Sequence, residues 1–585
     1  MSRLTIGAAH ENEELLFPMQ VKAEPAQRCV LKLSVEGLGL IVSAFLALTA
    51  NRAFLTAVEQ DLGPDSPAFW WMGGVMLVVL LALNFGLLML VSTRHMVKPV
   101  AALLLVISAL ASYYIDTLSV YIDTTMLRNV MRTDVAETRE LISLSLLLHL
   151  LLFAALPVAL LTRVRIQPRT WVRAAAVRAG SLVAAVLTLG VGVVLTYQPL
   201  SSLVRNHKEV RYLITPANVL WSASRVVVAE TRGAARPRVS IGDDAQAGAG
   251  WAQRERPLLV VLVVGETARA ANWGLSGYAR QTTPLLAQLA QSPQQAQEPL
   301  INFSKVIACG TNTETSLPCM FAPVGRRDYD EDRIRGSQSL LHVLHKAGVG
   351  VLWRDNQSGC KGVCEGLPQD TAQQAAGLAE CPGGRCLDEL LLADLDTRIA
   401  QARGVQLLVM HQLGNHGPSY FRRYPPRFAQ FTPACGEDDL QRCEKAHIVN
   451  AYDNALLYTD ELLATLIKRL AAQSSRVDSA VVYVSDHGES LGESNLFLHG
   501  LPFRIAPDVQ KEVPMVWWLS DGYVKSRGLD TACLRSRAAQ PASHDHLFHS
   551  MLTLLDVKTA LYEPAWDIAG PCLLPKPGVF AAPAR

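Results

Sequence analysis

Side chains able to bind a metal ion follow several short apolar runs in the second half of the chain. Glu266 follows the run LLVVLVV, and the neighbours Asp486 and His487 follow the run SAVVYVS. His416 lies in the turn HQLGNHGPSY after a third run, and His499 lies in FLHGLP. Carboxylate oxygens and neutral imidazole nitrogens are ligands that Zn²⁺ accepts. Singly, each residue is more often structural, as a helix cap or a turn histidine, but their shared position favours a metal site.

A hydroxyl nucleophile is offered by the segment ACGTNTETSLPCMFAP at residues 308–323. Its two cysteines would close a short loop if they were bonded to one another. Between them stand four hydroxyl residues: Thr311, Thr313, Thr315 and Ser316. A hydroxyl is a poor nucleophile at neutral pH and needs a base or a metal. A Zn²⁺ ion can meet this need by lowering the pKa of an oxygen bound to it.

The apolar runs themselves predict the elements that position these residues. Residues 258–264, 406–412 and 479–485 are short, continuous and rich in valine. Such runs are typical of strands covered on both faces, as in a parallel sheet between two layers of helices. Helical stretches are expected between them, at 283–291, 337–346 and 446–471. The sequence therefore predicts an α/β domain from about Arg256, with its ligands at the carboxyl ends of the strands.

The first 200 residues follow a different pattern, that of a membrane protein. Five apolar stretches are each close to the roughly 20 residues that cross a bilayer: 37–57, 69–92, 97–115, 141–161 and 174–197. Asn51 and Arg52 interrupt the first of them. Arginine and lysine crowd the loops on one side and acidic residues those on the other, which predicts a cytoplasmic N-terminus and places everything after about Tyr197 across the membrane. About thirty polar residues precede the first span, which disfavours a cleavable signal peptide.

The cysteines agree with this orientation. Ten of the eleven lie from Cys309 onward, and the other is Cys29. An even set in an exported domain indicates a disulfide framework, whereas a zinc ribbon is disfavoured because no CxxC pair recurs. Neighbours in the sequence suggest the groups Cys309/Cys319, Cys360/Cys364, Cys381/Cys386 and Cys435/Cys443, which leaves Cys533 and Cys572.

Four segments follow from these patterns: a polar cytoplasmic tail (1–30), a five-span membrane domain (31–197), a bridging segment (198–255) and a catalytic domain (256–585). Residues 200–235 mix apolar and basic positions, which fits either an amphipathic helix on the membrane surface or a packed connector. Residues 232–250 are rich in Gly, Ala and Pro and predict a flexible linker. A net charge of +2 without a basic, aromatic-rich stretch gives no sign of nucleic-acid binding.

Several long motifs resemble the phosphoethanolamine transferases: GETARAANWGLSGYARQTTP, CGTNTETSLPCMF, LWRDNQSGCKG, HQLGNHGPSYFRRYPP, NAYDNAL and YVSDHGESLGE. Within that family the chain is most similar to the lipid A phosphoethanolamine transferases, which include the transferable colistin-resistance enzymes. The resemblance implies an α/β periplasmic domain of alkaline-phosphatase/sulfatase type, joined to an all-α five-helix transmembrane domain. It also implies a monomer in the bacterial inner membrane, with the catalytic domain in the periplasm.

The resemblance extends to individual residues. It implies one Zn²⁺ ion, and allows a second, with ligands at Glu266, Thr313, Asp486 and His487. Thr313 also matches the nucleophile that becomes modified. Residues matched to the transferred phosphate and the acceptor are His416, His499, Lys361 and Ser358. Residues matched to a donor-lipid loop, MLRNVMRTDVAETREL, are Asn129, Thr133 and Glu137; their spacing of four puts them on one face if the loop is helical.

The reaction implied is transfer of phosphoethanolamine from phosphatidylethanolamine to a phosphate of lipid A through a phospho-threonine, with resistance to cationic peptides such as polymyxin as its consequence. Alternatives on the same scaffold are a transferase for core sugars (heptose or Kdo) or for a periplasmic glucan, and a metal-dependent membrane hydrolase. A sensor or scaffold with an inactive catalytic domain is disfavoured, because each matched ligand and the nucleophile are present.

Overall fold

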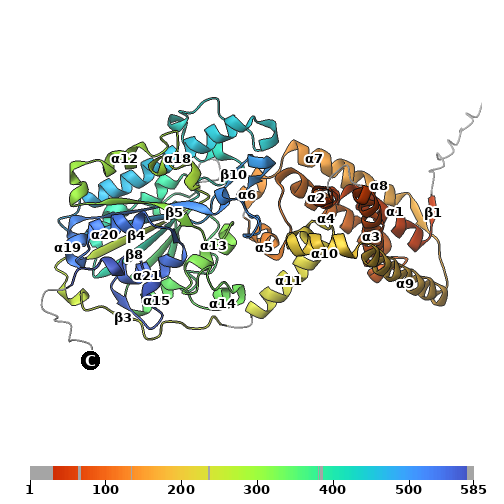
Figure 1. The fold of residues 1–585 in the computed structure, drawn as a ribbon, viewed down its shortest axis with the longest axis horizontal. Coiled ribbons are helices and arrows are strands. Elements are labelled where there is room, and N and C mark those ends of the chain that lie inside the picture. Colours follow the sequence, from red (N-terminus) through yellow and green to blue (C-terminus); the bar gives the residue numbers. More distant parts are fainter. Residues whose placement is uncertain are drawn as a thin grey trace, which may run out of the picture.

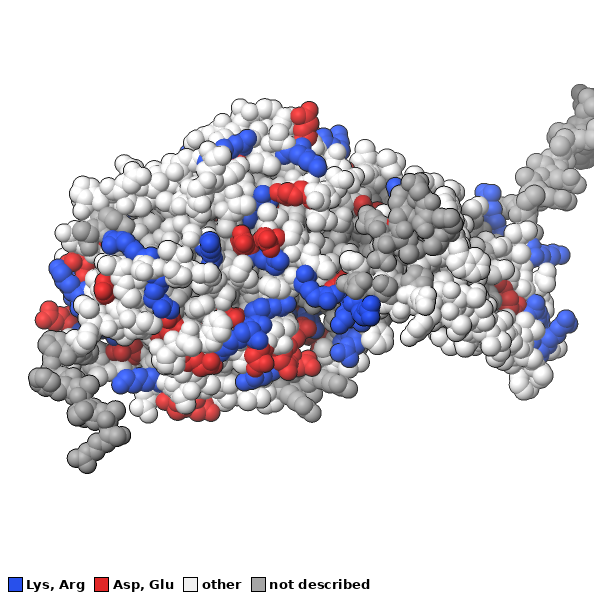
Figure 2. All heavy atoms as spheres, viewed as in Figure 1, with Lys and Arg blue, Asp and Glu red and all other residues white. Residues whose placement is uncertain are grey.

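The computed structural model describes residues 31–62, 67–133, 135–234, 237–379, 381 and 386–575. Figure 1 shows two parts side by side, a mainly helical part from the first 200 residues and a sheet covered by helices. Figure 2 shows charged side chains spread over the second part and at the far tip of the first, with a mostly uncharged surface between them. The tail predicted over residues 1–30, Cys29 included, lies outside the described residues.

Long apolar helices build the first part. By length and composition, four helices in the described ranges could cross a bilayer: Trp70–Val91 within α3 (Pro67–Val91), α4 (Val97–Leu118), Leu144–Thr162 and α9 (Trp171–Leu195). The third of them comprises α7 (Leu144–Leu150), a π-helical turn (Leu151–Ala155) and α8 (Leu156–Thr162). A fifth span exists if α1 (Val35–Thr49) and α2 (Arg52–Leu62) form one bent pair, with an angle of 52° between them.

Asn51 occupies the break between α1 and α2. Its buried side chain donates to the carbonyls of Leu46 and Thr215, and it accepts from the Thr215 N–H. These bonds satisfy backbone groups that a helix break would otherwise leave without partners. The polar interruption of the first apolar stretch is therefore a bend that is tied to the bridging segment.

Two short helices, α5 (Thr124–Arg132) and α6 (Val135–Glu140), lie between α4 and α7. A shared face for Asn129, Thr133 and Glu137 required one continuous helix, and this condition is not met, because α5 ends at Arg132 and Thr133 has extended backbone. The Thr133 hydroxyl donates to the Asn129 carbonyl (2.9 Å), taking the acceptor that a continuing helix would use. The Glu137 side chain is outside the described part of the structure.

The bridging segment contains α10 (Tyr197–Asn206), a 3₁₀ turn (Lys208–Leu213) and α11 (Ala217–Ala234). Leu203, Val210 and Leu213 join a core cluster with Phe54 of α2, which favours the packed connector among the two interpretations. The residues of the predicted flexible linker that the structure describes instead lie against the catalytic part. There β3 (Gln246–Ala247) pairs with β14 (Val557–Lys558), so the linker backbone finds hydrogen-bond partners in the sheet region.

An eight-stranded sheet in the order β13-β5-β12-β9-β4-β8-β6-β7 forms the centre of the catalytic part. As predicted, β4 (Leu258–Gly265), β8 (Val405–His411) and β9 (Asp478–Ser485) are parallel strands, and the structure makes them neighbours with β4 in the middle. Both faces are buried, because Leu258, Val260 and Leu262 join one hydrophobic core while the residues between them join another. The other strands of the sheet are β5 (Leu300–Ile307), β6 (Gly350–Asp355), β7 (Gln369–Thr371), β12 (Glu512–Leu519, antiparallel to β5 and β9) and β13 (Ala542–Ser543).

Helices cover the sheet, and three of them match the predicted helical stretches: α12 (Pro284–Ala290), α15 (Leu340–Lys346) and α18 (Lys445–Ala471). The remaining α-helices of this part are α13 (Thr313–Met320), α14 (Glu331–Gly336), α16 (Ala372–Ala375), α17 (Leu395–Gln401), α19 (Asp521–Arg527), α20 (Thr531–Ala538) and α21 (Asp545–Leu554). Outside the main sheet lie β1 (Leu31–Leu33) with β2 (Val164–Ile166), and β10 (Ser490–Leu491) with β11 (Phe497–Leu498).

Five disulfides confirm the predicted framework. They join Cys309 to Cys319, Cys360 to Cys364, Cys381 to Cys386, Cys435 to Cys443, and Cys533 to Cys572. All five lie in the catalytic part, as expected of a domain that folds where thiols are oxidised.

Candidate active site

The carboxyl ends of four adjacent parallel strands bring chemically useful residues to one edge of the sheet. Asp486 follows β9, Glu266 follows β4, His411 is the last residue of β8, and Asp355 is the last residue of β6. All four are buried. The strand order therefore places side chains from distant parts of the chain next to one another, at the edge where ligands of parallel sheets bind.

Thr313 is the first residue of α13, and several bonds fix this helix end. Asn312 caps the helix, accepting the Thr315 N–H (2.9 Å) in its side chain. The Ser316 hydroxyl donates to the Asp486 carbonyl (2.5 Å), which joins the helix to the end of β9. The disulfide between Cys309 and Cys319 closes the segment around them. Thr313 is thus held toward the strand ends.

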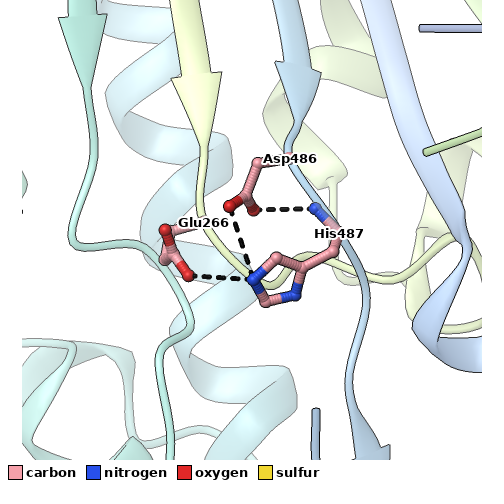
Figure 3. Close-up of side chains that lie close together, drawn as sticks. All are labelled: Glu266, Asp486 and His487. Atoms are coloured by element: carbon pink, nitrogen blue, oxygen red, sulfur yellow. Dashed lines mark hydrogen bonds and ion pairs between the residues drawn. The ribbon is translucent and has the colours of Figure 1, made fainter. Parts of the chain in front are cut away.

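The Thr313 hydroxyl lies among three buried ligand side chains. It donates to Glu266, with Oγ1 at 3.0 Å from Oε1 and 3.2 Å from Oε2. Thr313 Oγ1 is also 3.3 Å from His487 Nε2, which in turn lies 3.4 Å from Glu266 Oε1 and from Asp486 Oδ2. Figure 3 shows Glu266, Asp486 and His487 converging from two strand ends. The structure therefore brings together all four residues predicted as metal ligands.

The hydrogen bonds of His487 and Asp486 leave lone pairs directed at the centre of this group. His487 Nδ1 lies 2.9 Å from the Gly488 carbonyl, so this nitrogen is the donor and Nε2 presents its lone pair. Asp486 Oδ1 accepts the N–H groups of Thr267 and His487. Among the described residues, Asp486 Oδ2 has no hydrogen-bond partner although it is buried. The lone pairs of His487 Nε2 and Asp486 Oδ2 therefore face one another with no donor from the described residues between them, which fits a bound cation.

The charge of the site also fits a divalent cation. Glu266, Asp486 and His487 each offer an atom within 4.8 Å of the others, and all three side chains are fully buried. Burial and the neighbouring Asp486 carboxylate raise the pKa of Glu266 well above its usual value. Two carboxylates this close and this buried repel one another, and a dication of the kind that binds Asp, Glu and His relieves that repulsion.

The backbone at Glu266 is strained and closely packed. Thr267 has a φ of +53°, which is rare for a β-branched residue and costs about 1–3 kcal/mol. Its N–H donates to Asp486 Oδ1 and its carbonyl accepts from the Tyr452 hydroxyl (2.7 Å), which hold this conformation. On the other side, a Cβ at Gly414 would lie only 2.7 Å from the Glu266 carbonyl. Such over-determined strain is typical of functional sites.

His416 and His499 lie next to this group, as predicted. The His499 ring centre is 4.4 Å from that of His487 and 5.4 Å from that of His416. Glu489 contacts His499 Nδ1 through Oε1 at 3.2 Å. The site therefore continues from the carboxylates into a row of three imidazoles.

His411 and Asp355 were not predicted. His411 Nδ1 lies 2.9 Å from Asp355 Oδ1, and His411 Nε2 lies 3.8 Å from Glu266 Oε2. Burial lowers the pKa of His411, but the hydrogen bond and charge of Asp355 outweigh it, so the pKa is raised overall. The available signal was position alone, because both residues end apolar strands as Glu266 and Asp486 do.

Asp355 also connects this pair to the predicted residues Ser358 and Lys361. Asp355 Oδ2 accepts the N–H groups of Gln357 and Gly359, which shapes the loop after β6. In that loop the Lys361 ammonium donates to the Ser358 hydroxyl (2.6 Å) and carbonyl. The two residues thus contact one another at the end of β6, the strand next to β8.

The predicted donor-side segment reaches the catalytic part through α5, which packs against α13. A Cβ at Gly500, the residue after His499, would lie 2.6 Å from Met126 Cε and 4.0 Å from Asn312 Nδ2. Asn129 and Thr133 follow Met126 on the same short helix and at its end. The structure therefore brings this segment close to both His499 and the start of α13.

Known proteins share both parts of this architecture. Residues 80–231 match the family described as Phosphoethanolamine transferase EptA/EptB, and residues 259–557 match the Sulfatase family. Phosphoethanolamine transferase EptA of Salmonella typhimurium is 36% identical over 91% of this chain and 96% of its own. Phosphatidylethanolamine transferase Mcr-2 of Escherichia coli is 38% identical over 88% and 94%. The chain belongs to the phosphoethanolamine transferase family.

A solved structure supports the same assignment for the whole fold of this phosphoethanolamine transferase. The integral membrane protein lipooligosaccharide phosphoethanolamine transferase A (EptA) from Neisseria meningitidis matches with a TM-score of 0.86 and 35% identity, covering 93% of this chain and 100% of that one. The predicted combination of a helical membrane domain with a domain of alkaline-phosphatase/sulfatase type is confirmed.

Proposed function

We propose that this transferase moves phosphoethanolamine from phosphatidylethanolamine to a phosphate of lipid A through an ester on Thr313. The observation that carries the proposal is the Thr313 hydroxyl, which donates to Glu266 and lies 3.3 Å from His487 Nε2 in a buried cation site. The names of relatives support both substrates, since Mcr-2 is a phosphatidylethanolamine transferase and the Neisseria meningitidis protein acts on lipooligosaccharide.

The residues that would hold a Zn²⁺ ion are Glu266, Thr313, Asp486 and His487. Bound there, Zn²⁺ supplies concentrated positive charge that favours the ionised form of a hydroxyl. The convergent lone pairs and the partnerless Asp486 Oδ2 support this ligand set. A second ion near His416 and His499 would share the same pocket of imidazoles.

In the first step Thr313 Oγ1 attacks the phosphorus of the donor lipid. The Oγ1–P bond forms while the bond from phosphorus to the glycerol oxygen breaks, and diacylglycerol leaves after its oxygen takes up a proton from the solvent. Glu266 already accepts the Thr313 hydroxyl proton in a hydrogen bond and receives it in this step. His416, His499 and Lys361 offset the charge that develops on the phosphoryl oxygens.

In the second step a phosphate oxygen of lipid A attacks the same phosphorus. The bond between phosphorus and Thr313 Oγ1 breaks, and Thr313 recovers its proton from Glu266. The ester therefore exists only between the two lipids, and the threonine is regenerated. Burial of Thr313 and Glu266 limits access of water, which would otherwise hydrolyse the ester.

The location of the reaction follows from its substrates. Both lipids are anchored in the outer leaflet of the bacterial inner membrane, and five spans with a cytoplasmic N-terminus place the catalytic domain beside them in the periplasm. The added ammonium group partly cancels the anionic charge of lipid A. Cationic peptides such as polymyxin then bind the cell surface less strongly, because that binding is electrostatic.

The intact mass of the full-length protein, incubated with zinc and phosphatidylethanolamine but without acceptor, tests the central step. A phosphoethanolamine adduct mapped to Thr313 is expected, and Thr313→Ala removes it. The matched control is Thr311→Ala, because the Thr311 hydroxyl donates to the Leu501 carbonyl (2.6 Å) and not to the cation site. An unchanged adduct in Thr313→Ala contradicts the proposal.

Mass spectrometry of lipopolysaccharide from expressing cells decides the acceptor. Modified lipid A is the expected product. A modified core sugar instead would assign the activity of the Kdo(2)-lipid A phosphoethanolamine 7''-transferase of Escherichia coli, a relative at 28% identity. Release of free phosphoethanolamine at the same rate with and without acceptor would indicate a hydrolase.

A further inference from the structure

The segment formed by α5 and α6 is attached to the catalytic part at both ends by ion pairs. Figure 1 shows these helices at the junction of the two parts. At the end of α5, three arginines and three glutamates from four helices form one charge-balanced network, here called the α5 network: Arg128, Arg132, Glu230, Glu314, Glu331 and Arg335. At the end of α6, Glu140 pairs with Arg423, and both side chains are buried.

The α5 network reaches the residue next to the proposed nucleophile. Arg132 Nη1 donates to Glu314 Oε1 (2.8 Å), and Glu314 directly follows Thr313 in α13. The Glu314 side chain is fully buried and shares the same oxygen with Arg335 (2.9 Å). Arg132 also donates to Glu230 of α11 (2.8 Å), so one guanidinium bridges the bridging helix and the catalytic helix.

The pair at the end of α6 reaches a second residue of the site. Arg423 donates to both carboxylate oxygens of Glu140. Its Nε donates to the His416 carbonyl (2.6 Å), so the same guanidinium holds the backbone of a histidine beside the cation site. Near the start of α5, two residues before Arg128, Met126 lies against Gly500, next to His499.

We propose that Arg132 and Glu140 are positioning residues for the donor lipid. Through Glu314 and Arg423 they hold the α5–α6 segment in register with Thr313 and His416, so that the head group bound by that segment meets the nucleophile. The proposal rests on the proposed function, together with the expectation that Asn129 and Thr133 of this segment contact the donor lipid. Misplacement of reacting groups by about 1 Å can cost roughly 100-fold in rate, so small shifts of this segment matter.

The test is the rate of Thr313 adduct formation by full-length protein in nanodiscs, measured against the mole fraction of phosphatidylethanolamine. Arg132→Met and Glu140→Gln are each expected to raise the apparent KM for the donor about tenfold or more, with a smaller effect on kcat. Arg132→Lys, which keeps one charge, is expected to recover part of the loss. The control is Asp521→Asn, which breaks an exposed pair with Lys525 far from the junction.

Three results would overturn the inference. The first is an apparent KM for the donor that stays within threefold of the value for the unaltered protein in both folded variants. The second is a fall in kcat alone, which would show that these ion pairs affect the chemical step and not donor binding. If Arg132→Met does not fold in the membrane, Arg132→Lys is measured in its place. An unchanged KM in Arg132→Lys is then the third result that overturns the inference. The unaltered protein distinguishes the proposed function from this inference. If it forms no adduct at Thr313, the proposed function is contradicted, whatever the variants do.

Discussion

The Thr313 hydroxyl lies 3.0 Å from Glu266 Oε1, although the two residues are 47 positions apart in the chain. Glu266 follows β4 at the centre of the sheet, whereas Thr313 begins a helix that is bonded to the end of β9. A hydroxyl and a carboxylate from separate elements therefore share one proton at a cation site. This relationship brings the proposed nucleophile, its proposed base and the residues that would hold the metal together in one place.

Replacing Glu266 by Gln is expected to lower the transfer rate at least about 100-fold, because the amide keeps the shape but loses the charge that holds the cation and accepts the proton. The zinc content of the purified protein should fall together with the rate of adduct formation. Glu255→Gln, at an exposed position at the end of the bridging segment, is the control. Full zinc occupancy and full activity in Glu266→Gln would contradict the site.

Removal of the disulfide between Cys309 and Cys319 is expected to lower the free energy of unfolding by about 3 kcal/mol, since it closes a short loop in the unfolded chain. Adduct formation should slow as well, because this disulfide encloses Thr313. The double variant Cys435→Ala/Cys443→Ala removes a loop of similar length away from the site. It should lower the melting temperature comparably and leave adduct formation within threefold. Equal activity in both double variants would show that the first disulfide has no part in placing the nucleophile.

His544 predicts a specific loss of stability in acid. Its Nδ1 accepts the Cys309 N–H and its Nε2 donates to the Ser485 carbonyl, while burial lowers the pKa to about 4 from 6.5. His544 therefore binds a proton below pH 6.5 in the unfolded chain, but only below about pH 4 in the folded protein. Stability from this group is complete above pH 6.5 and falls by about 3 kcal/mol as the pH drops to 4.

His544→Asn keeps an acceptor near the Cys309 N–H but cannot titrate. Its melting temperature should therefore decline less than that of the unaltered protein between pH 6.5 and pH 4. His345→Asn, at an exposed position, should follow the unaltered curve. Parallel curves for all three proteins would show that His544 does not remain neutral in the folded state.

Asp355→Asn is expected to weaken zinc binding by about 10-fold without loss of the fold, because Asp355 holds His411 beside the proposed ligand Glu266. Asp355 orients His411 and shapes the loop of Ser358 and Lys361, but it does not contact the cation site itself. A competitive zinc titration with a chromophoric chelator measures the effect. The matched change Asp396→Asn alters a carboxylate that is 69% exposed and should bind zinc as before. An unchanged affinity in Asp355→Asn would mean that His411 needs no fixed orientation.

The central strands could be predicted from the sequence because their apolar runs are buried on both faces. Burial on both faces removes the usual alternation of apolar and polar residues along a strand. It leaves a continuous apolar run, which a short stretch of sequence is enough to show. The same windows show where each run ends, and hence that Glu266, Asp486 and His487 stand at strand ends. His411 and Asp355 stand at equivalent positions, but nothing local distinguishes a terminal residue of a strand from a partner of the metal site.

Two segments differ from what composition and spacing indicate, one because of a distant partner and the other because of a local side-chain hydrogen bond. Residues 237–250 resemble a linker in composition, yet Gln246 and Ala247 find a strand more than 300 positions away. The segment expected to contact the donor lipid has a helical spacing, yet α5 ends where the Thr133 hydroxyl donates to the Asn129 carbonyl. In both cases local preference is weak, and the available hydrogen-bond partners decide the backbone.

By itself the sequence determined the division into membrane and exported parts, the parallel strands and the residue types able to bind a cation. Hydropathy, valine-rich runs and cysteine placement are local properties of the sequence, so they can be recognised before the fold is known. Only the tertiary structure decided that β9, β4, β8 and β6 are neighbours, that Thr313 faces Glu266, and that Arg132 and Glu140 attach the membrane part to the site. Those contacts join residues from 47 to 283 positions apart, and the free energy that selects them comes from packing the whole chain.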